Sequence, residues 1–291
     1  MTPSSYVQTR DGLALAVYQH GDPADPTVVL VHGYPDDHSV WNGLVEQLRP
    51  AYHVVTYDVR GAGASEAPAS RHGYRLSQLV DDLGAVVDTV VPGKRFHLIG
   101  HDWGSIQGWE AVVDPDLAAQ ILSFTSISGP SLDMAAHWLR NVREHPVGTV
   151  KQLLDSTYIM AFQLPVLPEL AIGRGVLDLL VSRSKRAGAA RPTGRPTNDR
   201  DARNGLGLYR ANFLGRMTLP QPREVWVPVQ VLAPDDDAHV SSRMQREAPA
   251  PYCRNLLTHQ IRGNHWVVEQ DPALIAARFA DFVPYAHAVG R

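Results

Sequence analysis

The chain has 291 residues, of which 44% are hydrophobic and 20% charged, a composition typical of a globular protein with a sizeable core. Its formal net charge of −3 gives no signature of polyanion binding, so nucleic acid is excluded as an expected partner. The sequence shows no secretory signal and no run of about 18 apolar residues that could span a membrane. The single cysteine, Cys253, excludes an internal disulfide and is expected to pack as a half-buried small side chain. We therefore expect a cytoplasmic protein.

The first half of the chain alternates between strand and helix patterns. A hairpin comes first, with Asp11 and Gly12 at its turn. Short apolar runs, rich in β-branched residues, then predict buried strands, and helical spacing appears between them. The strands are expected at 28–33, 53–58, 96–100 and 121–128, and the helices at 40–48 and 76–90. This order predicts an α/β fold with a mostly parallel central sheet flanked by helices.

The alternation stops after Gly129 and returns near the end of the chain. Two further strands are expected at 227–234 and 255–261, followed by a helix at 274–282. The stretch between has helical pieces and a Gly/Pro/Arg-rich part, 183–203, that predicts a solvated loop. We therefore expect an α/β core and an inserted helical cap over the carboxyl edge of the sheet, where ligands bind in open α/β sheets. The core comprises 1–129 and 225–291, and the cap 130–224.

The residues with the clearest chemical pattern are HLIGHDWGS, 97–105. An apolar strand runs into Asp102, which has Gly100 and Gly104 two residues away on either side, and a helix pattern follows. This is the small-x-nucleophile-x-small pattern of a nucleophile elbow, with aspartate where serine hydrolases have serine. Aspartate is also a common helix N-cap, so the interpretation depends on the partners of Asp102.

These partners occur in the order nucleophile, acid, histidine that this fold uses. Downstream of the last predicted strand, His265 is the expected base, and three consecutive aspartates after the preceding strand supply the acid. The spacing from Val240 and from His265 favours Asp237, while Asp235 and Asp236 stay open as alternatives. Pro234 stands where this turn commonly has glycine.

Two backbone N–H groups are expected to form the oxyanion hole. One follows the first parallel strand, in the sequence His32-Gly33-Tyr34-Pro35, and the other follows the nucleophile. The predicted donors are therefore Tyr34 and Trp103.

The sequence resembles the epoxide hydrolase branch of the α/β-hydrolases over nearly its whole length. The motifs that carry the resemblance are HGYPDDHSVW (32–41), YDVRGAGAS (57–65), GHDWGS (100–105), LYRAN (208–212) and GNHWVVEQDP (263–272). It also looks like the N-terminal half of actinobacterial proteins that continue into a short-chain dehydrogenase domain. The resemblance leaves open a fusion of that kind and a homodimer.

The resemblance implies a two-step mechanism that converts a small lipophilic epoxide and water into a diol. Asp102 attacks the epoxide ring and forms an ester, and His265 activates the water that hydrolyses it. Tyr158 and Tyr209 match the two cap tyrosines that protonate the ring oxygen in this family. The expected substrate-binding residues are Trp103, His101, Phe162 and Trp266. No cofactor and no metal ion is expected.

Three other functions compete with this interpretation. A haloalkane dehalogenase shares the Asp nucleophile and the histidine, but residue 34 is Tyr where that class has Asn, and the tyrosine pair has no function in halide departure. A serine esterase is disfavoured because Ser105 stands three residues after the nucleophile position. A non-catalytic ligand receptor on the same scaffold is disfavoured because every catalytic role is filled.

Overall fold

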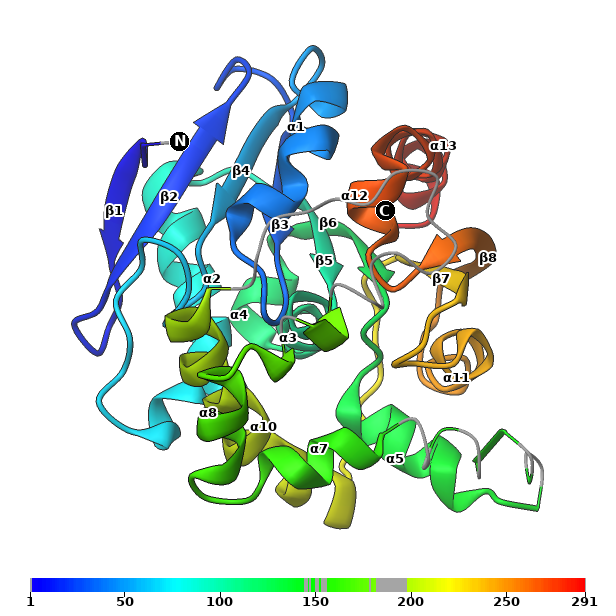
Figure 1. The fold of residues 1–291 in the computed structure, drawn as a ribbon. Helices are drawn as coiled ribbons and strands as arrows, with labels where there is room; N and C mark the ends of the chain where they lie inside the picture. Colours follow the sequence, from blue (N-terminus) through cyan, green and yellow to red (C-terminus); the bar gives the residue numbers. More distant parts are fainter. Residues whose placement is uncertain are drawn as a thin grey trace.

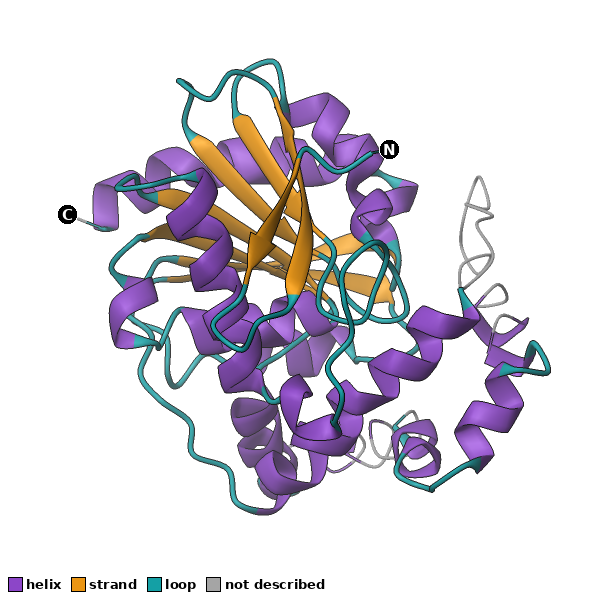
Figure 2. Cartoon of the chain, turned by 90° about the vertical axis from the view of Figure 1, so that its left-hand side faces the viewer, coloured by secondary structure: helices purple, strands orange, loops and turns teal. Residues whose placement is uncertain are grey.

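The computed structural model describes residues 2–143, 156–177, 179–181 and 198–290, together with 146, 148, 149 and 152. An eight-stranded sheet forms the centre, in the order β1-β2-β4-β3-β5-β6-β7-β8. Helices lie on both sides of this twisted sheet (Figure 1, Figure 2). The predicted α/β architecture is confirmed.

The strands match the expected order. β1 (Ser5–Gln8) and β2 (Ala14–His20) form the predicted antiparallel hairpin, and β2 also pairs antiparallel with β4. The other strands pair in parallel. They are β3 (Thr27–Val31), β4 (His53–Tyr57), β5 (Phe96–His101), β6 (Ile121–Ile127), β7 (Val229–Asp236) and β8 (Leu256–Asn264).

Alternate strand residues pack against the two helical layers. Val29 and Val31 lie in the same apolar cluster as residues of the helices α2 (Leu76–Val90) and α3 (Trp103–Ala111). Val28 and Leu30 point the other way and share a cluster with residues of α1 (Asn42–Leu48) and α13 (Pro272–Val289). Strands that are buried on both faces read as continuous apolar runs, which explains why the sequence showed no polar alternation in them.

The helices outside the β6–β7 connection cover the sheet. They are η1 (His38–Trp41), α1 (Asn42–Leu48), η2 (Arg71–Tyr74), α2 (Leu76–Val90), α3 (Trp103–Ala111), α4 (Pro115–Ala118), α11 (Ser242–Glu247), α12 (Val267–Gln270) and α13 (Pro272–Val289). The last is longer than the predicted 274–282. It begins earlier because the side chain of Asp271 caps it and Pro272 stands in its first turn, and it continues through Pro284.

The connection between β6 and β7 is helical in most of its described residues, and we call the following helices the cap helices. They are α5 (Leu132–Arg140), α7 (Thr157–Phe162), α8 (Leu167–Ile172) and α10 (Asp199–Thr218). They form the lower part of Figure 1. The described residues of this connection contain no strand, as expected.

The predicted loop at 183–203 lies mostly outside the described residues. Its last part is helical, because α10 begins at Asp199, so the prediction is wrong there. The cause is a local capping signal: the side chain of Asn198 accepts a hydrogen bond from the N–H of Arg200, and Asp199 and Asp201 lie in the first turn.

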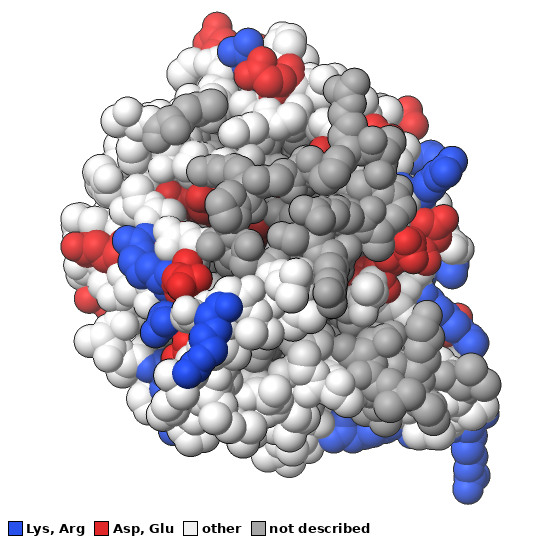
Figure 3. Space-filling model, viewed as in Figure 1, with Lys and Arg blue, Asp and Glu red and all other residues white. Residues whose placement is uncertain are grey.

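The surface shows no segregation of charge on the face drawn in Figure 3, where acidic and basic side chains are interspersed among the described residues. Within the described residues, none of the helices combines the length and the apolarity needed to cross a bilayer. Cys253 is half-buried, as expected, and burial raises the pKa of its thiol to about 12.

Candidate active site

Asp102 occupies a strained turn between β5 and α3. Its backbone has φ 51° and ψ −121°, a conformation that is uncommon for a residue other than glycine. Neighbouring backbone holds it in place: its N–H donates to the carbonyl of Ile127 at 3.0 Å, and its carbonyl accepts from the N–H of Ile106 at 2.9 Å. The turn aims the carboxylate away from the sheet, with 13% of the side chain exposed.

The small residues around Asp102 are required by close packing. A Cβ atom added at Gly104 would overlap the carbonyl of Val31 on β3, and one at Gly33 would overlap the side chain of Asp102. Glycine therefore lets β3 and the start of α3 approach the nucleophile turn.

The first predicted oxyanion donor contacts the carboxylate directly. The N–H of Tyr34 donates to Oδ1 of Asp102 at 2.8 Å. Trp103 is the first residue of α3, where helical N–H groups lack an intrahelical partner. Both predicted donors therefore adjoin Asp102: Tyr34 through this hydrogen bond and Trp103 as the next residue of the chain.

His265 lies between two carboxylates. Its Nδ1 is 3.0 Å and 3.1 Å from the two carboxylate oxygens of Asp237, and its Nε2 is 3.5 Å from Oδ2 of Asp102. Burial disfavours the charged imidazole, but the two carboxylates outweigh it and raise the pKa of His265 to about 10. The histidine is therefore an imidazolium at neutral pH.

Of the three consecutive aspartates, Asp237 is the one that reaches His265. Its side chain is fully buried, whereas Asp235 and Asp236 are exposed at the end of β7. Burial alone would raise the pKa of Asp237, but the charge of His265 and the surrounding hydrogen bonds lower it to about 2. Asp235 instead accepts a hydrogen bond from the N–H of Gly263.

A small apolar cavity of about 70 Å³ opens in front of Asp102. Trp103, Tyr158 and Tyr209 contribute to its wall. Most of the remaining wall is apolar and comes from both the core and the cap helices: Ile106, Pro130, Leu132, Ala135, Leu139, Ile159, Phe213, Met217, Val240 and Met244. The cavity is therefore suited to a lipophilic ligand.

The two predicted tyrosines face this cavity from different cap helices. Tyr158 lies on α7 and Tyr209 on α10, with ring centroids 6.4 Å apart. Burial raises the pKa of both phenols above its ordinary value, and the charge of Asp102 contributes in the same direction. Both hydroxyls are therefore protonated at neutral pH and available as donors.

Three residues expected to bind substrate lie outside the wall of this cavity. His101 is fully buried, and its Nε2 donates to the carbonyl of His265 at 2.7 Å. Trp266 is also buried, and its indole N–H donates to Asp36 at 2.8 Å. Both side chains contact the ring of His265: the ring centroid of His101 is 5.1 Å from that of His265, and the ring centroid of Trp266 is 4.9 Å from it.

Phe162 is the third of these residues. Its ring packs against Tyr158 and Tyr209 at centroid distances of 5.4 Å and 5.1 Å. It also contacts Tyr34 at 6.0 Å. The structure therefore places Phe162 behind the tyrosines, where it supports their rings.

Two residues of the site were not singled out from the sequence. His239 lies in the cavity wall, two positions after Asp237, and this proximity to the acid was the signal that could have found it. Gln245, on α11, is buried and donates to Oδ2 of Asp237 at 3.1 Å. The side-chain oxygen of Gln245 accepts a hydrogen bond from the N–H of Ser128, so Gln245 connects Asp237 to the end of β6. No sequence pattern marked Gln245.

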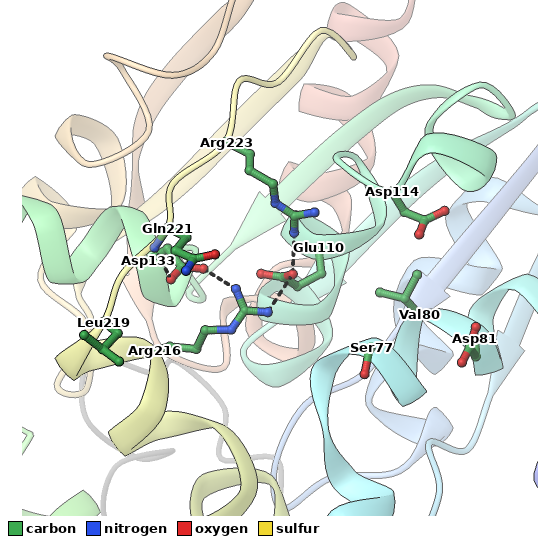
Figure 4. A pocket seen from close by; sticks show the side chains of 10 residues that line it. All are labelled: Ser77, Val80, Asp81, Glu110, Asp114, Asp133, Arg216, Leu219, Gln221 and Arg223. Carbon is green, nitrogen blue, oxygen red and sulfur yellow. Dashed lines mark hydrogen bonds and ion pairs between the residues drawn. The ribbon is translucent and has the colours of Figure 1, made fainter.

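A larger open hollow of about 530 Å³ lies elsewhere, and it contains none of the predicted site residues. Figure 4 shows Arg216, from α10, between Glu110 of α3 and Asp133 of α5. Arg223 donates to the same Glu110 at 2.6 Å. These ion pairs fasten the cap helices to the core, and we assign the hollow no catalytic role.

One group in the described residues has the donor atoms of a metal site. Asp37, His38 and Asp58 bring their oxygen and nitrogen atoms within 4.8 Å of one another. The carboxylate of Asp58 already accepts hydrogen bonds from the ring of His38 and the hydroxyl of Tyr18. This group therefore ties β2 to the loop after β3.

The family model described as "alpha/beta hydrolase fold" matches residues 26–266. The chain belongs to the α/β-hydrolase fold family.

The chain is similar to proteins named as epoxide hydrolases, which confirms the resemblance inferred from the motifs. "Epoxide hydrolase 4" of Mus musculus is 27% identical over 93% of this chain and 76% of its own length. The chain is also similar to a protein whose name gives another activity: "Probable oxidoreductase EphD" of Mycobacterium tuberculosis is 32% identical over 97% of this chain and 50% of its own length. The chain thus spans about half the length of that mycobacterial relative.

Solved structures agree on the fold. An epoxide hydrolase from metagenomes of hot environments superposes with a TM-score of 0.78 and 22% identity, covering 97% of this chain and 99% of its own. The Bacillus megaterium epoxide hydrolase bound to an inhibitor gives 0.77 and 19%, covering 96% and 100%.

Proposed function

We propose that this chain is an epoxide hydrolase that opens a lipophilic epoxide to a vicinal diol through an ester on Asp102. The observation that carries the proposal is the arrangement around one small cavity. A carboxylate paired with His265 faces it from the sheet, and the protonated phenols of Tyr158 and Tyr209 face it from the cap helices. In this proposal residues 1–129 and 225–291 form the core and residues 130–224 the cap.

The first step is ring opening. Asp102 is a nucleophile that needs no activating base, because a carboxylate is already ionised near neutral pH. It attacks one epoxide carbon, the carbon–oxygen bond of the ring breaks, and a phenol of Tyr158 or Tyr209 protonates the departing oxygen. A phenol is a far stronger acid than the alcohol being formed, so the transfer is favourable.

Ester formation changes the protonation of His265. The pKa of His265 is raised to about 10 partly by the charge of Asp102, and that charge disappears when the ester forms. The imidazolium then becomes a stronger acid and loses its proton, which converts His265 into a base at the moment when a base is needed. Asp237 holds the imidazole in the orientation that points Nε2 toward the ester.

The second step is hydrolysis of the ester. Neutral His265 takes a proton from a water molecule, which attacks the ester carbonyl of Asp102. The N–H groups of Tyr34 and Trp103 stabilise the resulting oxyanion, and each such donor is typically worth about 3–4 kcal/mol. The diol leaves, and the ionised Asp102 and protonated His265 are restored.

The test is turnover of three substrates by the purified chain: a fatty-acid epoxide, styrene oxide and a bromoalkane. We expect diol from at least one epoxide and little halide from the bromoalkane, since the phenols have no function in halide departure. Turnover of the bromoalkane alone would replace the proposal by a dehalogenase. Tight binding without turnover of any substrate would indicate a ligand receptor. The homodimer and the fused dehydrogenase domain stay predictions.

A further inference from the structure

The proposed reaction leaves a proton to be moved inside the site. Ring opening turns one cap tyrosine into a phenolate, and ester formation leaves His265 as an imidazolium beside a neutral ester. His265 cannot act as a base until it gives up that proton, and the phenolate cannot act as an acid in the next turnover until it regains one. Transfer of one proton from His265 to the phenolate satisfies both requirements.

His239 lies between these two groups. Its ring centroid is 4.7 Å from that of His265 and 5.6 Å from that of Tyr158, with both rings nearly perpendicular to its own. It also lies in the wall of the cavity that contains Asp102 and both tyrosines. Among the residues described in that wall, His239 is the only imidazole.

The position of His239 is fixed by its backbone and by packing. Its N–H donates to Oδ1 of Asp237 at 2.9 Å, and its carbonyl accepts from the side-chain amide of Gln152 at 2.9 Å. The ring of Trp266 packs against it at 5.7 Å. Asp237, which orients His265, therefore also holds His239, so the distance between the two imidazole rings is fixed.

The ring of His239 is neutral in the resting site. Burial, and then the charges of His265 and His101, lower its pKa to about 4. The carboxylates of Asp237 and Asp102 raise it, but by less. A neutral imidazole has one N–H donor and one nitrogen acceptor, so it can take a proton on one nitrogen and release one from the other.

We propose that His239 is a catalytic proton relay that carries a proton from His265 to the phenolate of Tyr158 after ring opening. The transfer needs no further reactant. His265 loses one proton, Tyr158 gains one, and His239 is neutral before and after. Hydrolysis then returns a water proton to His265, and the second water proton completes the diol hydroxyl released from Asp102. The inference rests on the epoxide hydrolase function proposed above.

The experiment compares the first turnover with steady turnover of an epoxide in His239→Gln, whose amide cannot shuttle a proton. Ester formation on Asp102, followed by rapid quench and mass spectrometry, should stay within a few-fold of the unmodified chain. The steady-state kcat should fall by about 10²-fold, the lower range of general acid–base effects. Phenolate absorbance in the ultraviolet should persist during turnover, and adding the double change Tyr158→Phe/Tyr209→Phe should abolish that signal.

A second variant distinguishes proton transfer by His239 from a purely structural role of its side chain. His239→Ala leaves a space beside His265, and added imidazole should restore kcat in proportion to its concentration. The matched control is Val240→Ala, which shortens a neighbouring wall residue without removing a titratable group, and imidazole should not accelerate it. A structural role for His239 would slow ester formation as well and would not respond to imidazole.

Each outcome decides the matter. If kcat is unchanged in His239→Gln, or falls together with ester formation and without a phenolate signal, the relay is refuted while the epoxide hydrolase function stands. If the unmodified chain forms no ester with any epoxide, the proposed function fails and the relay fails with it.

Discussion

The two sides of the cavity hold their functional groups by different means. On the sheet side, Asp102, Asp237 and His265 follow strand ends, and backbone hydrogen bonds and ion pairs fix them. On the cap side, Tyr158 and Tyr209 are placed by ring packing on two separate helices. Hydrogen bonds and ion pairs tolerate little displacement of their atoms, whereas ring packing tolerates more. The residues on the sheet side are therefore held in a fixed geometry, and the tyrosines on the cap side can shift to fit different ligands.

Tyr34 connects the two sides. Its N–H donates to Asp102, and its hydroxyl donates to the carbonyl of Ala202 in α10 at 3.0 Å. Its ring contacts that of Tyr209 at 5.4 Å. A movement of α10 is therefore transmitted to the residue that holds the nucleophile.

The largest effect should come from the sheet side. Asp102→Asn removes the nucleophile and should lower turnover by at least about 10³-fold without unfolding the chain. Asp235→Asn, an exposed change at the end of β7, is the matched control. Full activity in freshly purified Asp102→Asn would contradict the assignment, while slow recovery on standing would reflect deamidation.

Asp102→Asn also tests the electrostatic coupling between Asp102 and His265. Without the charge of Asp102, the imidazolium of His265 loses a stabilising partner, so the pKa of His265 should fall from about 10. Nitrogen chemical shifts of His265 followed against pH would measure it. An unchanged titration would mean that ester formation cannot convert His265 into a base.

The next effect separates the two steps of the reaction. His265→Gln should permit ester formation but slow its hydrolysis by about 10³-fold, so one substrate mass accumulates on the peptide that contains Asp102. Peptide mass spectrometry after incubation with an epoxide checks this. Absence of the adduct despite measured substrate binding would refute either the covalent mechanism or the role of His265.

On the cap side, the double change Tyr158→Phe/Tyr209→Phe removes both proton donors with little loss of volume. Ring opening should slow by about 10² to 10⁴-fold, and each single change should cost less because one donor remains. Single-turnover ester formation measures the effect, and any residual reaction with a bromoalkane, which needs no proton, should be almost unaffected by the same changes. Survival of epoxide opening within a few-fold would make these tyrosines packing residues only.

A smaller effect is expected for the acid. Asp237→Ala should slow ester hydrolysis by about 10²-fold, because His265 loses its orienting partner. Asp235→Ala and Asp236→Ala are the matched changes, and both should leave hydrolysis nearly unchanged because their side chains are exposed. A greater loss at either neighbour would transfer the role to it.

The smallest effect concerns the attachment of the cap. Arg216→Met breaks the ion pairs with Glu110 and Asp133, and Tm should fall by about 2–4 °C while kcat stays within a few-fold. Arg243→Met, in the exposed pair with Glu247, should leave Tm nearly unchanged. Equal effects of the two changes would show that the partly buried ion pairs of Arg216 do not stabilise the attachment.

The sequence predicted well what depends on local patterns. Asp102, Asp237 and His265 each follow a strand within a few residues, and an apolar run that ends in a turn marks such positions. The positions of the other strands along the chain followed from the same runs, and the hairpin followed from its Asp11-Gly12 turn. The start of α10 at Asp199 was missed because a Gly/Pro/Arg-rich composition concealed the capping signal of Asn198.

Side-chain direction was harder to predict. His101 and Trp266 are sequence neighbours of Asp102 and His265, which suggested that they line the cavity, yet both point into the core behind them. Gln245 reaches Asp237 from α11, and Arg216 reaches Glu110 from a helix 106 residues away. Such contacts depend on how elements pack, and spacing along the chain does not encode that directly.

The size of the cavity beside Asp102 has a kinetic consequence. Its volume of about 70 Å³ has room for roughly two water molecules, whereas pockets that hold small organic ligands occupy about 300–1,000 Å³. A larger epoxide can therefore bind only after the side chains or helices around the cavity rearrange. Ligand association should then be slower than diffusion, and its observed rate should level off at high substrate concentration at the rate of this rearrangement.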